Sequence, residues 1–320
     1  MRNRSKLKIN SNSKKYSLNQ SPFYKLKTKR KLIELLSLSM PELSIAKKDI
    51  DNYQVFDQMG NNGKPRTIQH PKNKQNEIHN RIANLLTRIE LPDYLHSGRK
   101  KHSHITNATQ HLGSKKVLTT DIKKFFQSTT REMVFRFFNK TLHCSSDVSD
   151  ILSYICTFNS HIPTGSQLSM PLAFWSNIDM FEQLDNLSAS LDVKMTVYVD
   201  DLTFSGEQVN KHFQSIVKKI IISNGQTPHP LKTKLFNKND LKIITGVVIK
   251  DDKTLITNKQ HKLIYQSFES WKGCRDEPLL ESYIKIKPKL LGRLNALSGI
   301  DPKLKDKAKS LMNYKSAAEI

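Results

Sequence analysis

"KMTVYVDDLTFSG", residues 194–206, places two adjacent aspartates, Asp200 and Asp201, inside a run of β-branched and aromatic residues. Such residues favour strands and are buried easily, whereas a carboxylate is costly to bury without a partner. Aspartate is also common at turns, so the pair alone could be an ordinary polar hairpin tip. The pattern predicts a β-hairpin that carries two like charges at its tip. Other parts of the chain must show what stabilises these charges.

The chain is long and strongly basic. Its 320 residues exceed the size at which a single core stops growing, about 250–300 residues, so two or three subdomains or one large one are expected. The 52 Lys and Arg against 29 Asp and Glu give a net charge of +23, which favours a polyanion or a membrane surface as partner. The sequence contains no apolar run of about 18 residues, so a membrane span is not expected. Nucleic acid in the cytoplasm is the expected setting.

The cysteines and the N-terminal segment bear on location. Three cysteines in no CxxC pair argue against a disulfide framework and a zinc site, and fit a reducing compartment. Residues 1–30 carry ten Lys or Arg and no acid, which predicts a mobile basic N-terminal arm. This segment lacks the apolar centre of a signal peptide, although a mitochondrial-type leader stays open.

Hydrophobic periodicity gives a mixed order of helices and strands. Strands are expected where apolar runs are bounded by turn residues, and helices where apolar residues recur at three and four. The expected elements are helices over 29–40 and 40–53, a hairpin over 53–71 with the turn GNNGKP, a helix over 72–89, a strand ending at 121, helices over 131–142 and 171–191, the hairpin 194–206, a helix over 207–223, a strand pair over 240–257 and basic helices from 258.

A third carboxylate ends an earlier strand, at Asp121 in KKVLTTDIKKFF. If this strand neighbours the hairpin in one sheet, three carboxylates converge at its edge. Like charges raise one another's pKa, so three anions this close need a cation between them. Oxygen ligands without Cys or His favour Mg²⁺. Two such ions would support phosphoryl transfer by activating the attacking hydroxyl and stabilising the leaving oxygen.

Six ordered segments over roughly residues 30–260 resemble reverse transcriptases: GKPRTIQHP, TDIKKFF, IPTGSQLSMPLA, YVDD, LKTK and ITGVVI. Within that superfamily, NATQH at 107–111 and ITG at 244–246 are similar to the NAxxH and VTG elements of bacterial retron enzymes. The resemblance implies an α+β right-hand polymerase with fingers, a palm of antiparallel sheet plus helices, and a helical C-terminal thumb. It implies N-terminal helices and fingers over 31–115, a palm over 116–250 within a reverse transcriptase domain of about 30–255, and an RNA-binding thumb over 256–320.

The same resemblance assigns roles to residues. Asp121, Asp200 and Asp201 would be the catalytic carboxylates that hold two Mg²⁺ ions, with the carbonyl of Ile122 as a further ligand. Nucleotide contacts would come from Lys64, Arg66, Phe126 as the gate against a 2′-hydroxyl, Gly165 with Ser169, and Lys232. Lys234 is placed equally well as Lys232 by sequence.

Several positions depart from the family pattern. Thr164 stands where many relatives have Gln, Met170 and Phe174 differ in the segment that follows, and Arg99 replaces an aromatic residue. The first three flank the implied nucleotide pocket, so they bear on its shape.

Retron membership implies more than these residues show. Such enzymes bind a structured noncoding RNA of their own locus, prime DNA synthesis from an internal 2′-hydroxyl and leave branched RNA-linked DNA, msDNA; many act in antiphage defence with a separate effector protein. The implied partners are this RNA, its DNA product and deoxynucleotides, and the implied RNA contacts are Asn107, His111, Lys285, Lys287, Lys289 and Arg293. The alternatives are another defence-associated or group II intron-like reverse transcriptase, or a noncatalytic RNA-binding scaffold.

Overall fold

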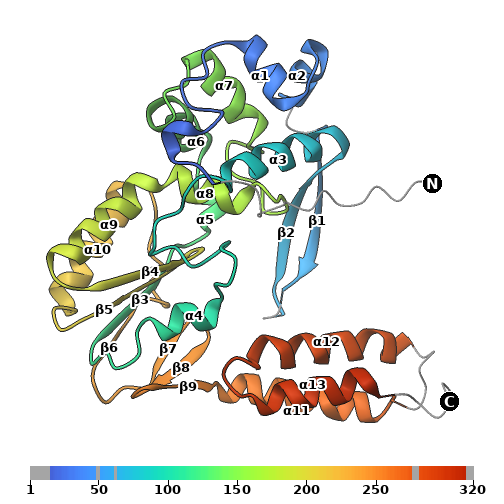
Figure 1. Cartoon of the computed structure of the whole chain (residues 1–320), viewed down its shortest axis with the longest axis vertical. Helices are drawn as coiled ribbons and strands as arrows, with labels where there is room; N and C mark the ends of the chain where they lie inside the picture. The colour runs from blue at the N-terminus through green and yellow to red at the C-terminus, as the bar shows by residue number, and fades with distance from the viewer. Residues whose placement is uncertain (1–14, 48–50, 61–62, 276–280, 315–320) are drawn as a thin grey trace.

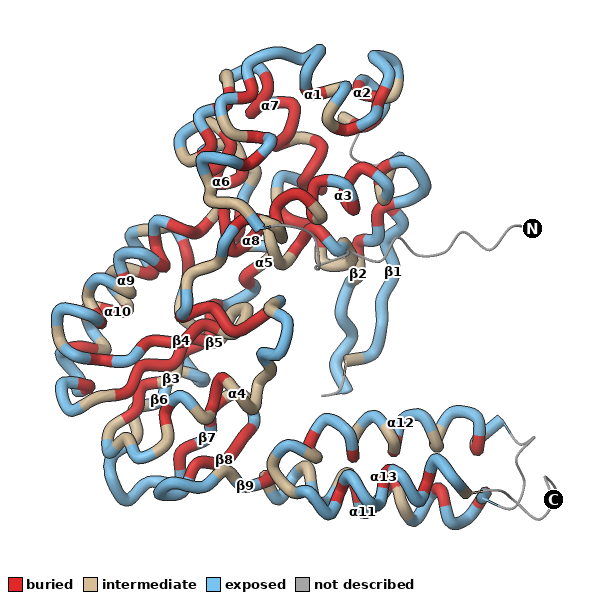
Figure 2. Tube along the Cα trace, viewed as in Figure 1, coloured by how far each residue is buried: buried red, intermediate tan, exposed pale blue. Residues whose placement is uncertain are grey.

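The computed structural model describes residues 15–47, 51–60, 63–275 and 281–314. Figure 1 shows the expected right-hand arrangement: a helical fingers region with a projecting hairpin, a palm built on a sheet, and a thumb of three helices. Figure 2 shows that burial is concentrated in the palm strands and the fingers helices, whereas the hairpin is exposed along most of its length. No helix in these ranges is long and apolar enough to cross a membrane.

The fingers combine N-terminal helices with two that come later in the chain. The predicted apolar stripe of α3 is buried at Ile78, Ile82, Leu85 and Leu86, so the three-and-four spacing correctly predicted this helix. Within the range predicted as palm, 116–250, α7 packs against α1 and α6 packs against both α7 and α8. The elements are η1 (Leu18–Gln20), α1 (Lys29–Leu36), α2 (Met40–Ala46), β1 (Tyr53–Met59), β2 (Pro65–Pro71), α3 (Asn73–Leu86), α6 (Arg131–Arg136), the π-helix η2 (Phe137–Thr141) and α7 (Ser146–Ile155).

The N-terminal segment is part of the fold. The prediction of a mobile basic arm over 1–30 is wrong for residues 15–28, and residues 1–14 lie outside the described ranges. Tyr16 exchanges backbone hydrogen bonds with the end of the α3 region at Arg88 and Glu90. Phe23 is fully buried edge-to-face against Phe138, with ring centroids 5.7 Å apart. An aromatic side chain in a basic segment has therefore docked that segment on the fingers core.

The palm is a four-stranded antiparallel sheet in the order β4-β5-β3-β6. Its central strand β3 buries both Val117 and Leu118, as expected for a strand covered on both faces. α9 packs on β4 and α10 packs on α9. The elements are β3 (Val117–Asp121), α5 (Phe125–Ser128), α8 (Ser169–Ser176), α9 (Ile178–Ser190), β4 (Lys194–Tyr198), β5 (Asp201–Ser205), α10 (Lys211–Ser223) and β6 (Lys234–Phe236).

Two predicted palm helices have different limits. The single helix expected over 171–191 is broken at Asn177, whose side chain donates to the Ala173 carbonyl and to Thr129 while it accepts from Gln226. The helix expected over 207–223 begins only after Asn210, because the Asn210 side chain accepts from the Phe213 N–H and caps it.

A second, three-stranded sheet joins palm and thumb. It has the order β7-β8-β9, one strand more than the expected pair, and α4 packs against β8. The thumb has a hydrophobic core of its own that includes Trp271, Leu290, Leu294 and Leu311. The elements are α4 (His104–Thr109), β7 (Lys242–Ile244), β8 (Val247–Lys250), β9 (Lys253–Ile256), α11 (Asn258–Lys272), α12 (Glu281–Leu297) and α13 (Lys303–Asn313). The hairpin β1–β2 is confirmed, although residues 61 and 62 of its turn lie outside the described ranges.

Candidate active site

The predicted neighbourhood of the two aspartate segments is confirmed. The register of β3 and β5 places Asp121 directly opposite Asp201, and Asp200 lies in the tight turn between β4 and β5. The Ile122 N–H donates to the Asp200 carbonyl at 2.9 Å, and the His229 N–H donates to the Asp121 carbonyl at 2.7 Å. The backbone of all three aspartates is therefore held by the palm sheet and the segment before β6.

The three carboxylates repel one another. Burial raises the pKa of Asp201 to about 7, helped by the charges of Asp200 and Asp121, and burial with the charge of Asp121 also raises the pKa of Asp200. The Lys232 ammonium lies 2.5 Å from an Asp121 carboxylate oxygen. Burial by itself lowers the Lys232 pKa, but the hydrogen bond to Asp121 and the nearby aspartate charges outweigh it and raise that pKa. The edge carries more negative charge than one lysine balances.

This donor set fits a divalent cation. Hard carboxylate oxygens are what Mg²⁺ prefers, and buried like-charged carboxylates with raised pKa values are a group that a cation stabilises. Among the described residues, however, no three His, Cys, Asp or Glu side chains already stand as a metal cluster. Lys232 partly replaces the cation by binding Asp121. The sequence did not predict this lysine contact, which favours Lys232 over Lys234 as the lysine of the site.

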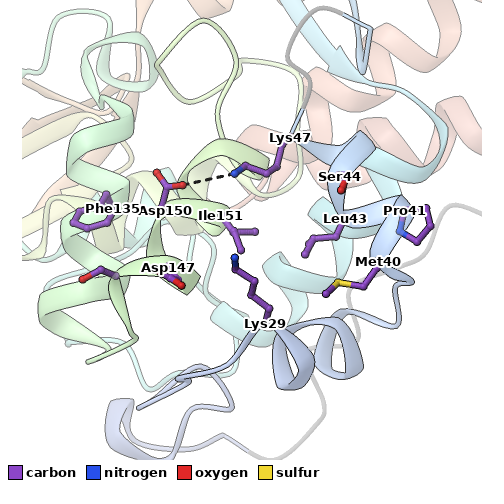
Figure 3. A pocket seen from close by; sticks show the side chains of 11 residues that line it. Lys29, Met40, Pro41, Leu43, Ser44, Lys47, Phe135, Asp147, Asp150 and Ile151 are labelled. Carbon is purple, nitrogen blue, oxygen red and sulfur yellow. Dashed lines mark ion pairs between the residues drawn. The ribbon is translucent and has the colours of Figure 1, made fainter.

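Two cavities differ in their relation to the carboxylates. One of about 290 Å³ adjoins them and is lined by Asp201, Lys232 and the turn that contains Thr245 and Gly246. A larger groove of about 810 Å³ lies between α1–α2 and α6–α7, where Lys47 pairs with Asp150 at 3.7 Å (Figure 3). Lys29, Met40 and Ile151 also line that groove (Figure 3). None of the aspartates 121, 200 and 201 reaches this groove, so only the smaller cavity belongs to the candidate site.

The loop 163–166 is hydrogen-bonded to the hairpin strand β2. The Gly165 N–H donates to the Gln69 carbonyl at 3.1 Å, and the Thr164 hydroxyl donates to the Thr67 carbonyl at 2.9 Å. The Thr164 N–H in turn donates to the Gln69 side chain at 3.3 Å. The departure at Thr164 thus has a structural role, because its hydroxyl links the palm loop to the fingers hairpin.

The implied nucleotide residues differ in exposure and contacts. Arg66 is exposed on β2, and its charge offsets a small part of the burial effect that raises the Asp200 pKa. Lys64 is exposed just before β2. Phe125 is buried and Phe126 is partly exposed beside it, with ring centroids 5.9 Å apart. The Ser169 hydroxyl is buried and donates to the Pro163 carbonyl, so it shapes the loop.

The segment 92–99 escaped the sequence analysis, although it lies along the outer edge of β4. The Val197 N–H donates to the Tyr94 carbonyl at 2.8 Å, and the His96 N–H donates to the Val197 carbonyl at 2.9 Å. Arg99 donates to the Pro92 and Leu95 carbonyls and closes the segment on itself. The one feature of the sequence that pointed to this segment was Arg99, which stands where relatives usually have an aromatic residue.

Two implied RNA contacts are corrected. Asn107 and His111 are 0 % exposed, so a direct contact of either side chain with RNA is wrong. His111 bonds the Ser205 and Thr196 hydroxyls at 2.7 and 2.8 Å, and burial lowers its pKa to about 3, which keeps it neutral. The neighbouring Thr245 hydroxyl donates to the His104 carbonyl at 2.8 Å. Ala108 of NATQH and Ile244 of ITG belong to one small hydrophobic cluster, so the two elements pack together beside the second sheet.

The four implied contacts on α12 are not equivalent. Arg293 donates through one guanidinium nitrogen to the Leu263 carbonyl and to Ser267 on α11, so it joins two thumb helices. Lys287 donates to Tyr283 at 2.8 Å, and Lys285 pairs with Glu281. Lys285 and Lys289 are exposed and remain candidates for RNA contacts.

No protein-family model matches the chain. A solved foamy viral protease–reverse transcriptase in complex with double-stranded DNA aligns with a TM-score of 0.47 and 16% identity, over 84% of this chain and 40% of that one.

Curated retron enzymes match at higher sequence identity. The retron Ec48 reverse transcriptase of Escherichia coli is 26% identical over 90% of this chain and 75% of its own length. The retron Ec86 reverse transcriptase of Escherichia coli is 26% identical over 66% and 68%, and the retron Se72 enzyme of Salmonella heidelberg is 28% identical over 49% and 42%. These matches show that the chain resembles retron reverse transcriptases over most of its length, and together with the aspartates of its palm they support an RNA-directed DNA polymerase of that type.

Proposed function

We propose that this polymerase copies a structured noncoding RNA of its own locus into DNA, starting from a 2′-hydroxyl within that RNA, so that msDNA branched from RNA is the product. The observation that supports this most is the edge where Asp121 faces Asp201 beside Asp200, in a chain that matches retron enzymes. Two bound Mg²⁺ ions would activate the attacking hydroxyl and neutralise charge on the leaving phosphates.

The carboxylates and the Ile122 carbonyl would hold these ions. Asp121 and Asp201 come from adjacent strands and Asp200 from the rigid turn, so no chain movement is needed to bring the three residues together. Ile122 follows Asp121 directly, and its own N–H bonds the Asp200 carbonyl.

Basic residues would handle the triphosphate. Lys64 and Arg66 lie on the hairpin, and the planar guanidinium of Arg66 can bind phosphate bidentately. Lys232 keeps its proton because the aspartates raise its pKa, so it can deliver that proton to the leaving pyrophosphate once it is released from Asp121. Gly165 would allow the loop to approach the nucleotide.

The thumb would hold the RNA. Lys285 and Lys289 are exposed on α12, and phosphate contacts of this kind position RNA without reading its sequence. The reaction would take place in the cytoplasm. A separate effector protein would use the product in antiphage defence, which predicts that disrupting a neighbouring gene abolishes protection while msDNA is still made.

The product itself tests the function. Cells that carry this gene with its flanking DNA should yield an RNA–DNA molecule whose mobility changes after RNase treatment and again after debranching of the 2′–5′ bond. A linear DNA product that needs no debranching would instead indicate a reverse transcriptase of another kind.

Phe126 provides a test of nucleotide choice. Phe126→Ala should allow ribonucleotide incorporation, because the partly exposed ring would no longer block a 2′-hydroxyl. We expect the preference for dNTP over rNTP, measured as a ratio of kcat/KM, to fall by about 100-fold or more, since one steric contact is worth several kcal/mol. Phe125→Leu is the matched control, because Phe125 is buried. Unchanged sugar selectivity in Phe126→Ala would remove the gate assignment.

A further inference from the structure

The turn that presents the two adjacent aspartates is strained. Val199 has φ of +60°, in the left-handed region, and a β-branched residue rarely adopts it. Such a conformation is costly and persists only where neighbouring contacts impose it. Because Val199 immediately precedes Asp200, any relaxation of its backbone would redirect both carboxylates.

One side chain holds this backbone. The Val199 N–H donates to the Ser97 hydroxyl oxygen at 3.0 Å, and Ser97 is 3 % exposed. Ser97 follows the segment that pairs with β4 through Tyr94 and His96, so it continues that pairing into the turn. Ser97 is 102 residues away in sequence from Val199, whose N–H donates this hydrogen bond.

Three neighbours fix where Ser97 stands. Arg99 ties the segment to the Pro92 and Leu95 carbonyls and lies 3.4 Å from Asp93. Gly98 has φ of +67°, and a Cβ there would lie 2.1 Å from the end of the Met170 side chain. A side chain at position 98 would displace Met170, which belongs to the first turn of α8. The departures at Arg99 and Met170 are thus both parts of this support.

We propose that Ser97 is a positioning residue for catalysis, which holds Val199 in its left-handed conformation so that Asp200 and Asp201 meet Asp121. This inference rests on the proposed role of those carboxylates in holding the metal ions. Ser97 itself is buried behind the turn and contacts its backbone; it touches neither carboxylate in the hydrogen bonds of the described residues.

A different result is expected if Ser97 has a structural role alone. If Ser97 only satisfies a buried N–H, its loss would lower stability and leave the metal site as it is. If it holds the turn, its loss would weaken cation binding at the carboxylates, and that effect would disappear where residue 199 adopts the left-handed conformation easily. Asn tolerates this conformation far better than Val.

The experiment compares Ser97→Ala with Ser97→Thr in the full chain bound to its RNA. For Ser97→Ala we expect kcat for DNA synthesis to fall about tenfold, equivalent to about 1.4 kcal/mol, with an unchanged KM for dNTP. Binding of Mn²⁺, measured by electron paramagnetic resonance without nucleotide, should weaken about tenfold. Ser97→Thr keeps the hydroxyl and should restore both. Ser190→Ala, at an exposed helix end, is the matched control.

A double-mutant cycle with Val199→Asn completes the test. In that background Ser97→Ala should cost less than about threefold, because the turn no longer needs to be held. Equal losses in both backgrounds, or Mn²⁺ binding and kcat of Ser97→Ala like those of the unmodified enzyme, would overturn the proposal. If Ser97→Ala does not fold, Ser97→Cys, which keeps the volume but accepts weakly, takes its place, and failure of both to fold would show a purely structural residue. An unmodified enzyme that makes no DNA would refute the proposed function instead.

Discussion

Replacing Asp200 and Asp201 together by Asn should abolish DNA synthesis while RNA binding stays within about twofold. Asn keeps the size and shape of Asp but removes both negative charges, so the edge beside Asp121 would no longer attract divalent cations. We expect the synthesis rate to fall by more than about a thousandfold, since such electrostatic groups contribute several kcal/mol each. Primer extension on the cognate RNA measures the rate, and filter binding measures RNA affinity.

The same variant separates catalysis from folding. Asp201 is partly buried and its pKa is raised by burial and by two neighbouring carboxylates, so neutral side chains there should leave the melting temperature without metal unchanged or higher. Asp192→Asn is the matched control, because Asp192 lies in an exposed turn before β4. DNA synthesis at the normal rate by the double variant would favour a noncatalytic RNA-binding scaffold.

Gly165→Ala should damage nucleotide binding through the fingers hairpin. A Cβ at this position would lie 2.8 Å from the Gln69 carbonyl oxygen and from the Ile68 side chain, and a backbone atom cannot move aside cheaply. The loop would have to separate from β2 and lose the bonds made by Thr164 and Gly165. Overpacking of this kind costs about 1–3 kcal/mol, so we expect the KM for dNTP to rise about tenfold or more.

Thermal unfolding without nucleotide identifies the cause. If the hairpin contact is what Gly165 permits, the melting temperature of the free protein should fall; if Gly165 only leaves room for the nucleotide, it should stay the same. Gly292→Ala is the matched control, because Gly292 lies in α12 with nothing within 4 Å of an added Cβ. A Gly165→Ala enzyme as active and stable as Gly292→Ala would contradict the hairpin contact.

Local patterns predicted the elements that depend on nearby residues. The strand ending at Asp121 and the hairpin around Asp200 follow from apolar runs bounded by polar turns, whereas their pairing was a condition of the metal-site hypothesis that the register of β3 and β5 satisfies. The face of α3 follows in the same way from its spacing. These features are encoded within windows of some ten to fifteen residues.

What the sequence did not reveal depends on partners far along the chain. The break at Asn177 is stabilised by Thr129 and Gln226, which lie 48 and 49 residues away. His111 looks like a ligand for RNA, but its partners Ser205 and Thr196 lie 94 and 85 residues on and turn it inward. Ser97 is an unremarkable serine until the fold brings it to Val199.

The separate core of the thumb has a spectroscopic consequence. The chain has two tryptophans, Trp175 in the large core of fingers and palm and Trp271 in the thumb core. Regions with their own cores can unfold as separate cooperative units. Fluorescence of a Trp271→Phe protein would therefore report on the polymerase body alone, and that of a Trp175→Phe protein on the thumb alone. The polymerase body and the thumb each carry one intrinsic fluorophore, so the unfolding of each region can be followed without an added label.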